Sequence, residues 1–357
     1  MSWGGCIFLL QIRVFLKPDM DVVQNYSLKD FNTFHLDARA KLYVEVYSEE
    51  EVIELIEDGV MAQLPKFILG GGSNILFTKN FDGICIKNNL EGIEKIKEDD
   101  DFVFIKSASG EVWNDLVMYC VERNYGGIEN LSLIPGTVGA APMQNIGAYG
   151  VELKEVFEEL EAVDLLTGEI KKFRLHDCRF GYRESVFKHE LKNQFMILNV
   201  TLRLRKQPIF NTSYGAVETE LKAMGVNEKS ISAISQAVCN IRRSKLPDPA
   251  IIGNAGSFFK NPEVPVEKHE SLKKDFPDLV AYKTLNNKMK LAAGWLIEQC
   301  GWKGKRVGNV GMHQQQALVL VNYGNATGQE LIDHARKVQQ SVKEKFDVDL
   351  EMEVNIL

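Results

Sequence analysis

The sequence has few of the residues that metal sites and disulfide frameworks require. Its 357 residues include six cysteines and six histidines, and none of them forms a CxxC, HxxxH or HExxH pattern. Cysteines that are widely spaced and lie in apolar stretches are typical of reduced, buried thiols in a reducing compartment. We therefore expect no metal site and no disulfide-stabilised secreted domain, and the pattern predicts a cytoplasmic protein.

Positive charge is also scarce. Lys and Arg together number 42 against 49 Asp and Glu, which gives a net charge of -7. Non-specific binding to nucleic acid draws its affinity largely from neutralised phosphates, so this balance argues against a nucleic-acid partner. A small anionic ligand can still bind in a local basic pocket.

Long apolar runs are missing as well. The strongest candidate, residues 6–16, reads CIFLLQIRVFL and is too short and too polar to span a bilayer. It has neither the cationic start nor the cleavage site of a signal peptide, so we expect no membrane partner. An alternative start at Met20 would make residues 1–19 an upstream extension, and we prefer it because periodic sequence begins only after that point.

What the chain does have is the composition of a folded protein, with 45% hydrophobic and 25% charged residues. At about 150 residues per domain, the length predicts two or three domains. Residues that alternate in polarity predict strands near 41–47, 83–87, 196–205 and 350–356. Helical periodicity and capping boxes at Ser48/Glu51 and Thr327/Glu330 predict helices near 48–59, 111–124, 229–242, 287–300 and 327–345.

A glycine run at residues 70–74, GGGSN, lies between two short apolar segments and is not followed by a helical pattern. It is therefore neither a Rossmann fingerprint nor a Walker loop, because both must open a helix at the phosphate. Two interpretations remain. The run is either a tight hairpin turn or a nest of backbone N–H groups that binds an anion, and on its own it favours the hairpin.

A second segment of small residues, 134–150, shifts the preference from the hairpin to the anion-binding nest. It is rich in Pro, Gly and Ala and contains two amides, Gln144 and Asn145, that can read a heteroaromatic edge. Two such loops can enclose a long, flat, phosphorylated cofactor. The cofactor-binding residues predicted in the two loops are Gly70, Gly71, Gly72, Ser73, Asn74, Pro135, Gly136, Thr137, Gly139, Ala140, Gln144, Asn145 and Gly147.

The run IPGTVGAAPMQNIGAYGVE at 134–152, with GGGSN upstream, resembles the UDP-N-acetylenolpyruvoylglucosamine reductase family. Three later blocks strengthen the resemblance: GYRESVFK at 181–188, GNAGSFFKNP at 253–262, and the terminal segment 350–354. It extends from about residue 25 to the end, with the motifs in order. The terminal block departs from the family pattern, since Met352 replaces a proline and Asn355 replaces an arginine.

This resemblance implies an α+β fold, with a two-part FAD-binding region of the vanillyl-alcohol-oxidase/PCMH type and a C-terminal α+β substrate domain. The expected division is residues 20–86 with 347–357, then 87–207, then 208–346. The resemblance also implies non-covalent FAD, NADPH as the reductant and a monomer. UDP-N-acetylglucosamine enolpyruvate would be reduced to UDP-N-acetylmuramate for peptidoglycan, with hydride from flavin N5 to C3 and a proton to C2.

The resemblance further implies three catalytic residues. Ser257 would donate the proton, although without the motif it would be interpreted as a turn serine. Arg183 would hold the substrate carboxylate, and its alternative is a surface ion pair with Glu184. Glu353 would act on the same carboxylate. Alternation places Glu351 on the same face, so only the motif position selects Glu353. If Glu353 donates a hydrogen bond, it must be protonated, which requires a raised pKa.

For the nucleotide part of the substrate, the resemblance implies Tyr149, Tyr214, Lys245, Asn261 and Gln316. Tyr214 lies in an insert, 208–215, that is typical of one subtype, in which the tyrosine closes over the substrate. Lys245 would supply charge for phosphate. Its basic cluster also suits a helix C-terminus, where cations complement the helix dipole, and both interpretations can hold.

Two other functions are weighed against this one. An oxidase of a small alcohol or amine from the same flavin superfamily would lack the GSFFKNP block and often attaches FAD through His or Cys, of which residues 70–74 contain neither. A noncatalytic nucleotide-sugar-binding protein would not require Arg183, Ser257 and Glu353 together.

Overall fold

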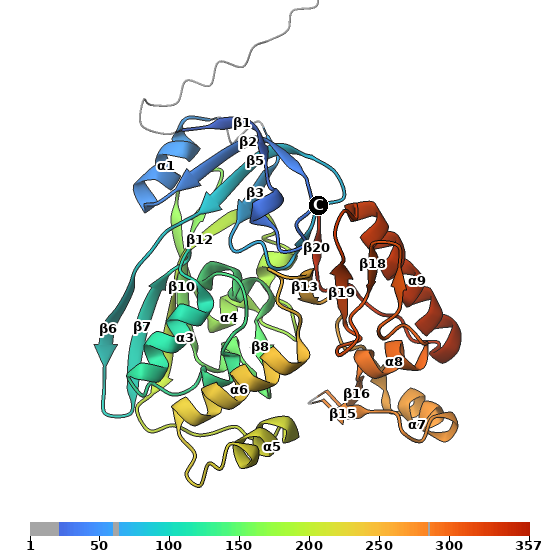
Figure 1. The fold of residues 1–357 in the computed structure, drawn as a ribbon. Coiled ribbons are helices and arrows are strands. Elements are labelled where there is room, and N and C mark those ends of the chain that lie inside the picture. The colour runs from blue at the N-terminus through green and yellow to red at the C-terminus, as the bar shows by residue number, and fades with distance from the viewer. Residues whose placement is uncertain (1–20, 60–63, 285) are drawn as a thin grey trace, which may run out of the picture.

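The computed structural model describes residues 21–59, 64–284 and 286–357. The expected upstream extension, 1–19, and the alternative start Met20 lie outside these ranges. Three sheets form the framework, one at the top of Figure 1, one at the left and one at the right, and they meet near the C-terminus. Within the described ranges, no helix combines the length and apolar character needed to cross a membrane.

The first sheet has the strand order β1-β2-β5-β3, with β2, β5 and β3 parallel and β1 antiparallel to β2. Its strands are β1 (Val23–Ser27), β2 (Arg39–Val46), β3 (Lys66–Leu69) and β5 (Phe81–Asn88). Helix α1 (Glu49–Glu57) packs against it, and its N-cap residue Ser48 accepts a hydrogen bond from the Glu51 backbone N–H. Only this half of the predicted capping box is present, because the Glu51 carboxylate accepts the Tyr47 N–H instead of the Ser48 N–H. A 3-10 helix, η1 (Lys29–Phe31), follows β1.

The hairpin interpretation of residues 70–74 is wrong. Strand β3, before the glycines, pairs with β5 in the first sheet, whereas β4 (Ile75–Leu76), after them, pairs in parallel with β20 (Asn355–Ile356). The two flanking strands therefore belong to different sheets. The glycine run carries the chain from one sheet to the next.

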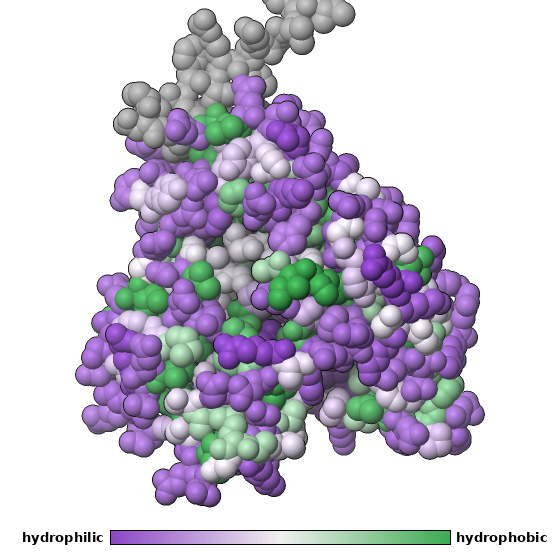
Figure 2. Space-filling view, viewed as in Figure 1, coloured by the Kyte–Doolittle hydropathy of each residue, from purple (hydrophilic) through white to green (hydrophobic). Residues whose placement is uncertain are grey.

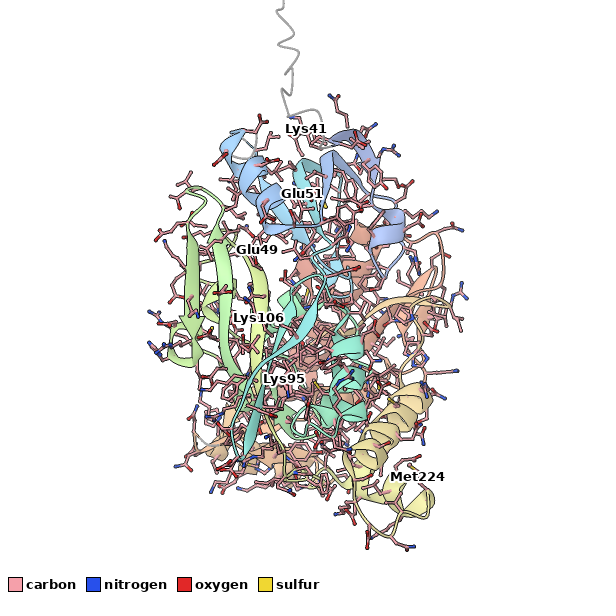
Figure 3. The ribbon with its side chains drawn as sticks, turned by 90° about the vertical axis from the view of Figure 1, so that its left-hand side faces the viewer. Lys41, Glu49, Glu51, Lys95, Lys106 and Met224 are labelled. Atoms are coloured by element: carbon pink, nitrogen blue, oxygen red, sulfur yellow. The ribbon has the colours of Figure 1, made fainter. Side chains whose placement is uncertain are left out.

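The second sheet is antiparallel throughout, in the order β11-β10-β12-β7-β6. Its strands are β6 (Ile93–Glu98), β7 (Phe102–Ala108), β10 (Phe157–Asp164), β11 (Ile170–Arg174) and β12 (Phe195–Arg205). One face packs on α3 (Trp113–Glu122), which buries its apolar side as predicted. Figure 3 views the molecule from the side of β6 and β7, where Lys95 and Lys106 are labelled.

Between α3 and β10, the chain runs through the predicted irregular segment. Its short elements are η2 (Glu129–Leu131), η3 (Val138–Ala140), η4 (Pro142–Gln144), β8 (Gly147–Ala148), β9 (Val151–Glu152) and η5 (Leu153–Glu155). Two more, α4 (Leu175–Cys178) and η6 (Val186–Lys188), precede β12. Small residues with few regular hydrogen bonds allow this segment to follow the edge of a cavity rather than form a sheet.

Helices α5 (Gly215–Ala223) and α6 (Ile231–Lys245) pack against each other, and α6 also contacts η2 and α3 of the second region. The N-cap residue Ser230 starts α6 close to the predicted position. The expected domain 208–346 would group α6 with the third sheet instead. That division, like the rest of the expected domain boundaries, stays a prediction.

The third sheet, β13-β19-β18-β17, is antiparallel and carries α8 and α9 on one side. The elements of this region are β13 (Gly253–Ser257), β14 (Glu263–Pro265), α7 (Val266–Asp275), β15 (Ala281–Lys283), β16 (Lys288–Leu291), α8 (Ala293–Gln299), β17 (Arg306–Val307), β18 (Val310–Met312), β19 (Val319–Asn322) and α9 (Gly328–Phe346). The capping box at Thr327 and Glu330 is present at the start of α9.

Two predicted elements in this region need correction. The helix expected over 287–300 begins only at Ala293, because residues 288–291 alternate Lys-Met-Lys-Leu and pair with both β14 and β15. The strand expected over 350–356 is regular only at Asn355–Ile356. Leu350 and Val354 are buried in the core of the third region, so the chain must leave that core before it reaches β4.

Candidate active site

A cavity of about 780 Å³ lies where the three regions meet. Figure 2 shows pale and apolar residues near the centre of the face, between regions that are mostly hydrophilic. Of the predicted site residues, those that line the cavity are Gly70, Gly71, Gly72, Ser73, Asn74, Pro135, Thr137, Gly139, Ala140, Gln144, Gly147, Arg183, Ser257, Asn261 and Glu353. Segments far apart in the sequence therefore converge on one space, of a size typical of ligand pockets.

One wall of the cavity, which we call the glycine wall, consists of residues 70–74 and 134–140. A Cβ atom on Gly70 would lie 2.4 Å from Thr137 Oγ1, and one on Gly71 would lie 2.9 Å from the Gly136 Cα. Gly72 has a φ of +63° and backs onto the Phe31 carbonyl. Only glycine permits this approach at Gly71 and Gly72, so residues 70–72 present peptide groups to the cavity beside the small side chains of Ser73 and Thr137. That surface fits a long phosphorylated cofactor such as FAD.

Amide side chains connect the glycine wall to the C-terminal segment. Asn74 Nδ2 donates to Gln144 Oε1 at 2.7 Å, and Gln144 Nε2 donates to Glu353 Oε1 at 3.4 Å. The backbone N–H and the side-chain amide of Asn355 both donate to the Asn74 carbonyl, each at 3.0 Å. At the position where the family pattern has an arginine, Asn355 thus makes neutral hydrogen bonds that hold the segment in place.

Arg183 lies at the tip of a tight turn. Gly181 N donates to Glu184 O at 3.0 Å, and Arg183 itself has a φ of +57°, in the left-handed region. Its Nη2 donates to the Gly147 carbonyl at 2.5 Å, and its Nε lies 3.2 Å from Glu353 Oε1. The alternative of an ion pair with Glu184 is wrong, because Glu184 instead contacts Lys260 and His189.

Glu353 is distinguished from Glu351 by its surroundings. The Glu353 side chain is 12% exposed and faces the cavity, whereas the Glu351 side chain is 69% exposed and binds Lys260. Burial raises the pKa of Glu353, although Arg183, Lys188 and Lys260 oppose the rise. The direction is the one that a hydrogen-bond-donating carboxyl requires.

Ser257 is the last residue of β13 and faces the cavity. Just beyond it, Glu353 N donates to Phe258 O at 2.8 Å and Lys260 N donates to Glu351 O at 2.9 Å. These two bonds run between the segment that follows Ser257 and the segment that ends in Glu353. The hydroxyl of Ser257 and the carboxyl of Glu353 are therefore carried by one short antiparallel pair.

The five residues predicted to bind the nucleotide are not all close to the cavity. The rings of Tyr149 and Tyr214 meet edge to face at 5.4 Å, and Tyr214 is 44% exposed. Asn261 Oδ1 accepts the Ala293 N–H at 2.9 Å and so caps α8. Lys245 is exposed at the end of α6, and Gln316 Oε1 accepts the Leu318 N–H at 3.4 Å. Among the described residues that line the cavity, only Asn261 comes from this set; Tyr149, Tyr214, Lys245 and Gln316 do not belong to the lining.

Asn145 is fully buried, and its amide group is already occupied. Its Nδ2 donates to the Gly181 carbonyl at 2.9 Å, and its Oδ1 accepts the Lys154 N–H at 3.0 Å. In this structure it supports the turn that carries Arg183. Its place among the cofactor-binding residues, like that of Gly136, stays a prediction.

Sequence reasoning did not single out Lys188, which lines the cavity beside Arg183. Its Nζ donates to the Arg183 carbonyl at 3.3 Å, and burial lowers its pKa. We call Arg183, Lys188 and Glu353 the charged corner. Lys188 is part of the GYRESVFK block, but the sequence alone cannot show that its side chain turns inward. Arg242, from the same basic cluster as Lys245, also lines the cavity.

No group of three or more His, Cys, Asp or Glu side chains that could hold a metal ion occurs in the described part of the chain. The donors that line the cavity are peptide N–H groups, amides and a few cations. That set suits a phosphorylated organic cofactor and an anionic substrate.

Comparisons with known proteins agree with this description. Residues 248–357 match the family described as UDP-N-acetylenolpyruvoylglucosamine reductase, C-terminal domain, and residues 40–174 match an FAD binding domain family. A solved structure of the reductase from Thermus caldophilus has a TM-score of 0.62 at 22% identity, over 94% of this chain and 98% of that one. It shows the shared fold.

Two curated relatives are much closer in sequence. The UDP-N-acetylenolpyruvoylglucosamine reductase of Flavobacterium johnsoniae is 48% identical over 95% of this chain and 100% of its own length. That of Amoebophilus asiaticus is 52% identical over 95% and 100%. At this identity and coverage, the chain belongs to the UDP-N-acetylenolpyruvoylglucosamine reductase family.

Proposed function

We propose that the cavity is the site where the protein reduces the enolpyruvyl group of UDP-N-acetylglucosamine enolpyruvate to give UDP-N-acetylmuramate. Family membership makes the protein an FAD-dependent oxidoreductase of peptidoglycan synthesis, with NADPH as co-substrate. The observation that carries the proposal is the meeting of Arg183, Glu353 and Ser257 beside the glycine wall. Non-covalent FAD would lie along that wall.

FAD held along the glycine wall would supply the hydride chemistry that links oxidation of NADPH to reduction of the enolpyruvyl group at C3. The glycine wall would hold the cofactor largely through peptide groups, because Gly71 packs on the Gly136 backbone and Gly70 on the small side chain of Thr137. The hydrogen bonds from Asn74 to Gln144 and from Gln144 to Glu353 fix the position of this wall relative to Glu353.

The charged corner stabilises the charge that develops on the substrate. Hydride addition at C3 builds enolate charge on the substrate carboxylate, and a guanidinium can bind such a group with two parallel hydrogen bonds. Arg183 is held for this role by its bonds to Gly147 and Glu353. Glu353, with a pKa raised by burial, donates a hydrogen bond to the same carboxylate when it is protonated.

Ser257 completes the reduction by giving its hydroxyl proton to C2. A serine hydroxyl is a weak acid, so the transfer requires a strongly basic carbon and positive charge near the transient alkoxide. Arg183 and Lys188 supply that charge at the charged corner. The alkoxide then recovers a proton from solvent, to which Ser257 is exposed.

The nucleotide of the substrate would extend toward Tyr149, Tyr214 and Asn261, with Lys245, Gln316 and Arg242 near the diphosphate. Tyr214 is exposed enough to move over a bound ligand. We place the reaction in the cytoplasm, carried out by a monomer with small-molecule partners and with no nucleic-acid or membrane partner.

A spectroscopic experiment tests the function. The purified protein should be yellow, its flavin absorbance should be bleached by NADPH, and the enolpyruvyl nucleotide should restore it. A protein that cannot be loaded with FAD would contradict the proposal.

Ser257→Ala tests the proton donor. The variant should keep bleaching by NADPH nearly normal but slow reoxidation by substrate at least about hundredfold. Stopped-flow absorbance measures the two half-reactions separately. Equal loss of both would show that Ser257 is not the specific proton donor.

A further inference from the structure

One buried ammonium group stands behind the charged corner. Lys260 lies three residues after Ser257, and its side chain is 7% exposed. Its neighbours Phe259 and Asn261 line the cavity, so Lys260, in the same extended segment, turns to the opposite side. There its Nζ binds the carboxylates of Glu184 and Glu351, the latter at 2.5 Å.

Both carboxylates are sequence neighbours of the charged corner. Glu184 directly follows Arg183 and closes the same turn, since its N–H donates to the Gly181 carbonyl at 3.4 Å. Glu351 precedes Glu353 by two residues, and its carbonyl accepts the backbone N–H of Lys260 at 2.9 Å. A single lysine therefore contacts the segments on both sides of the Arg183–Glu353 pair.

The turn that carries Arg183 needs such outside support. Arg183 has a φ of +57°, a conformation that residues with a side chain rarely adopt. The turn comes from the second region of the fold, while Glu353 belongs to the C-terminal segment packed in the third. Lys260, also in the third region, reaches the turn through Glu184.

We propose that Lys260 is a positioning residue of the reduction, which ties the turn bearing Arg183 to the segment bearing Glu353 so that the two side chains meet. This inference rests on the proposed function. Lys260 itself does not belong to the described lining of the cavity, so it acts through its two carboxylate partners rather than on the substrate.

The arrangement also balances charge. The three cations Arg183, Lys188 and Lys260 face the three carboxylates Glu184, Glu351 and Glu353. Without Lys260, Glu353 would face Arg183, Lys188 and the Tyr182 hydroxyl, while Glu351 would lose its ion pair and Glu184 would keep only His189 as its ion-pair partner. Negative charge near a carboxyl favours its protonated form, so the pKa of Glu353 would rise further.

The test compares Lys260→Met with Lys260→Arg in the FAD-loaded protein. In Lys260→Met, reoxidation by the enolpyruvyl nucleotide should slow about tenfold or more, while bleaching by NADPH stays within about threefold. The alkaline limit of reoxidation should move to higher pH. Lys260→Arg should restore most of both properties, because a guanidinium can also bind two carboxylates. Calorimetry should show weaker binding of UDP-N-acetylmuramate to Lys260→Met and recovery in Lys260→Arg.

A milder variant and its control keep the proposal testable if Lys260→Met does not fold. Glu351→Gln removes one partner from an exposed position and leaves Lys260 paired with Glu184, so reoxidation should slow about threefold or more. Asp349→Asn is the matched control. It removes an 82% exposed carboxylate from the same segment, one paired at 3.0 Å with Lys343, and should leave both half-reactions unchanged.

Equal slowing of the two half-reactions in Lys260→Met would overturn the proposal, as would identical behaviour of Glu351→Gln and Asp349→Asn. Failure of the proposed function would look different. In that case, the enolpyruvyl nucleotide would not reoxidise the flavin even in the unaltered protein.

Discussion

The glycine wall and the charged corner enclose the same cavity but are built by opposite means. At residues 70–72 of the glycine wall, side chains are missing because neighbouring segments approach until even a Cβ atom would clash. At the charged corner, side chains form the surface: Arg183 is held by Glu353 and the Gly147 carbonyl on other segments, and Lys188 by the Arg183 carbonyl. The first surface depends on shape and the second on ionisation. Substitutions in the two should therefore damage different steps.

The largest effect is expected from Gly71→Val. A Cβ at this position would lie 2.9 Å from the Gly136 backbone, which cannot move away as a flexible side chain could, so the two loops must separate. We expect the variant to be purified without bound flavin. The ratio of absorbance at the flavin band to that of the protein measures this loss.

Gly215→Ala is the control for Gly71→Val. Gly215 begins α5 and has no atom within 4 Å of an added Cβ, so the flavin content should not change. A Gly71→Val protein that retains flavin normally would contradict the shape argument.

A smaller effect, confined to the second half-reaction, is expected from Arg183→Lys. Lysine keeps the positive charge but cannot bind Glu353, the Gly147 carbonyl and a substrate carboxylate together. Flavin content and bleaching by NADPH should be preserved, while reoxidation by substrate falls about hundredfold. If Arg183→Lys lost flavin instead, the separation of the two surfaces would fail.

The smallest effect is on the free energy of unfolding alone, and it comes from an ionisable group outside the charged corner. His334, on α9, is buried against Trp302, and burial lowers its pKa to about 4 from an ordinary value of 6.5. Because the folded state disfavours protonation, stability is complete above pH 6.5 and falls as the pH drops towards 4. We expect a loss of about 1–3 kcal/mol in the free energy of unfolding over this range.

His334→Phe keeps the ring contact and removes the titration, so denaturant unfolding should show a flatter pH dependence between 6.5 and 4. Reoxidation rates at neutral pH should not change, because His334 lies outside the described cavity lining. An unaltered pH dependence of stability would show that His334 has the same pKa in the folded and unfolded states, and would contradict the effect of burial.

Local patterns predicted the elements with clear signals. The capping boxes at Ser48 and Thr327 gave the starts of α1 and α9, because a side-chain cap is a short-range interaction. Residues 288–291 were missed because their strand is stabilised by pairing with β14 and β15, which no local window contains. The apparent hairpin at the glycines failed for the same reason, since the partner of β4 is some 280 residues away, at β20.

For the site, the motif resemblance supplied Arg183, Ser257 and Glu353, and the structure shows why periodicity could not. Glu351 and Glu353 have the same alternation, and only the fold exposes one and buries the other. Lys188 and Lys260 could not be recognised from the sequence because their importance depends on which way each side chain turns. Lys260 contacts Glu184 and Glu351 on other segments, and Lys188 contacts the Arg183 carbonyl through a turn that no periodic pattern predicts.

The bare peptide surface of residues 70–72 has a consequence for inhibitor design. A compound that binds the exposed Tyr214 can be defeated by replacing that side chain, which few other residues constrain. A compound that packs against Gly71 meets main-chain atoms, and a substitution there would place a Cβ atom 2.9 Å from the Gly136 Cα and force the loops apart. Resistance by point mutation at Gly71 would therefore destroy the cofactor site of the enzyme itself.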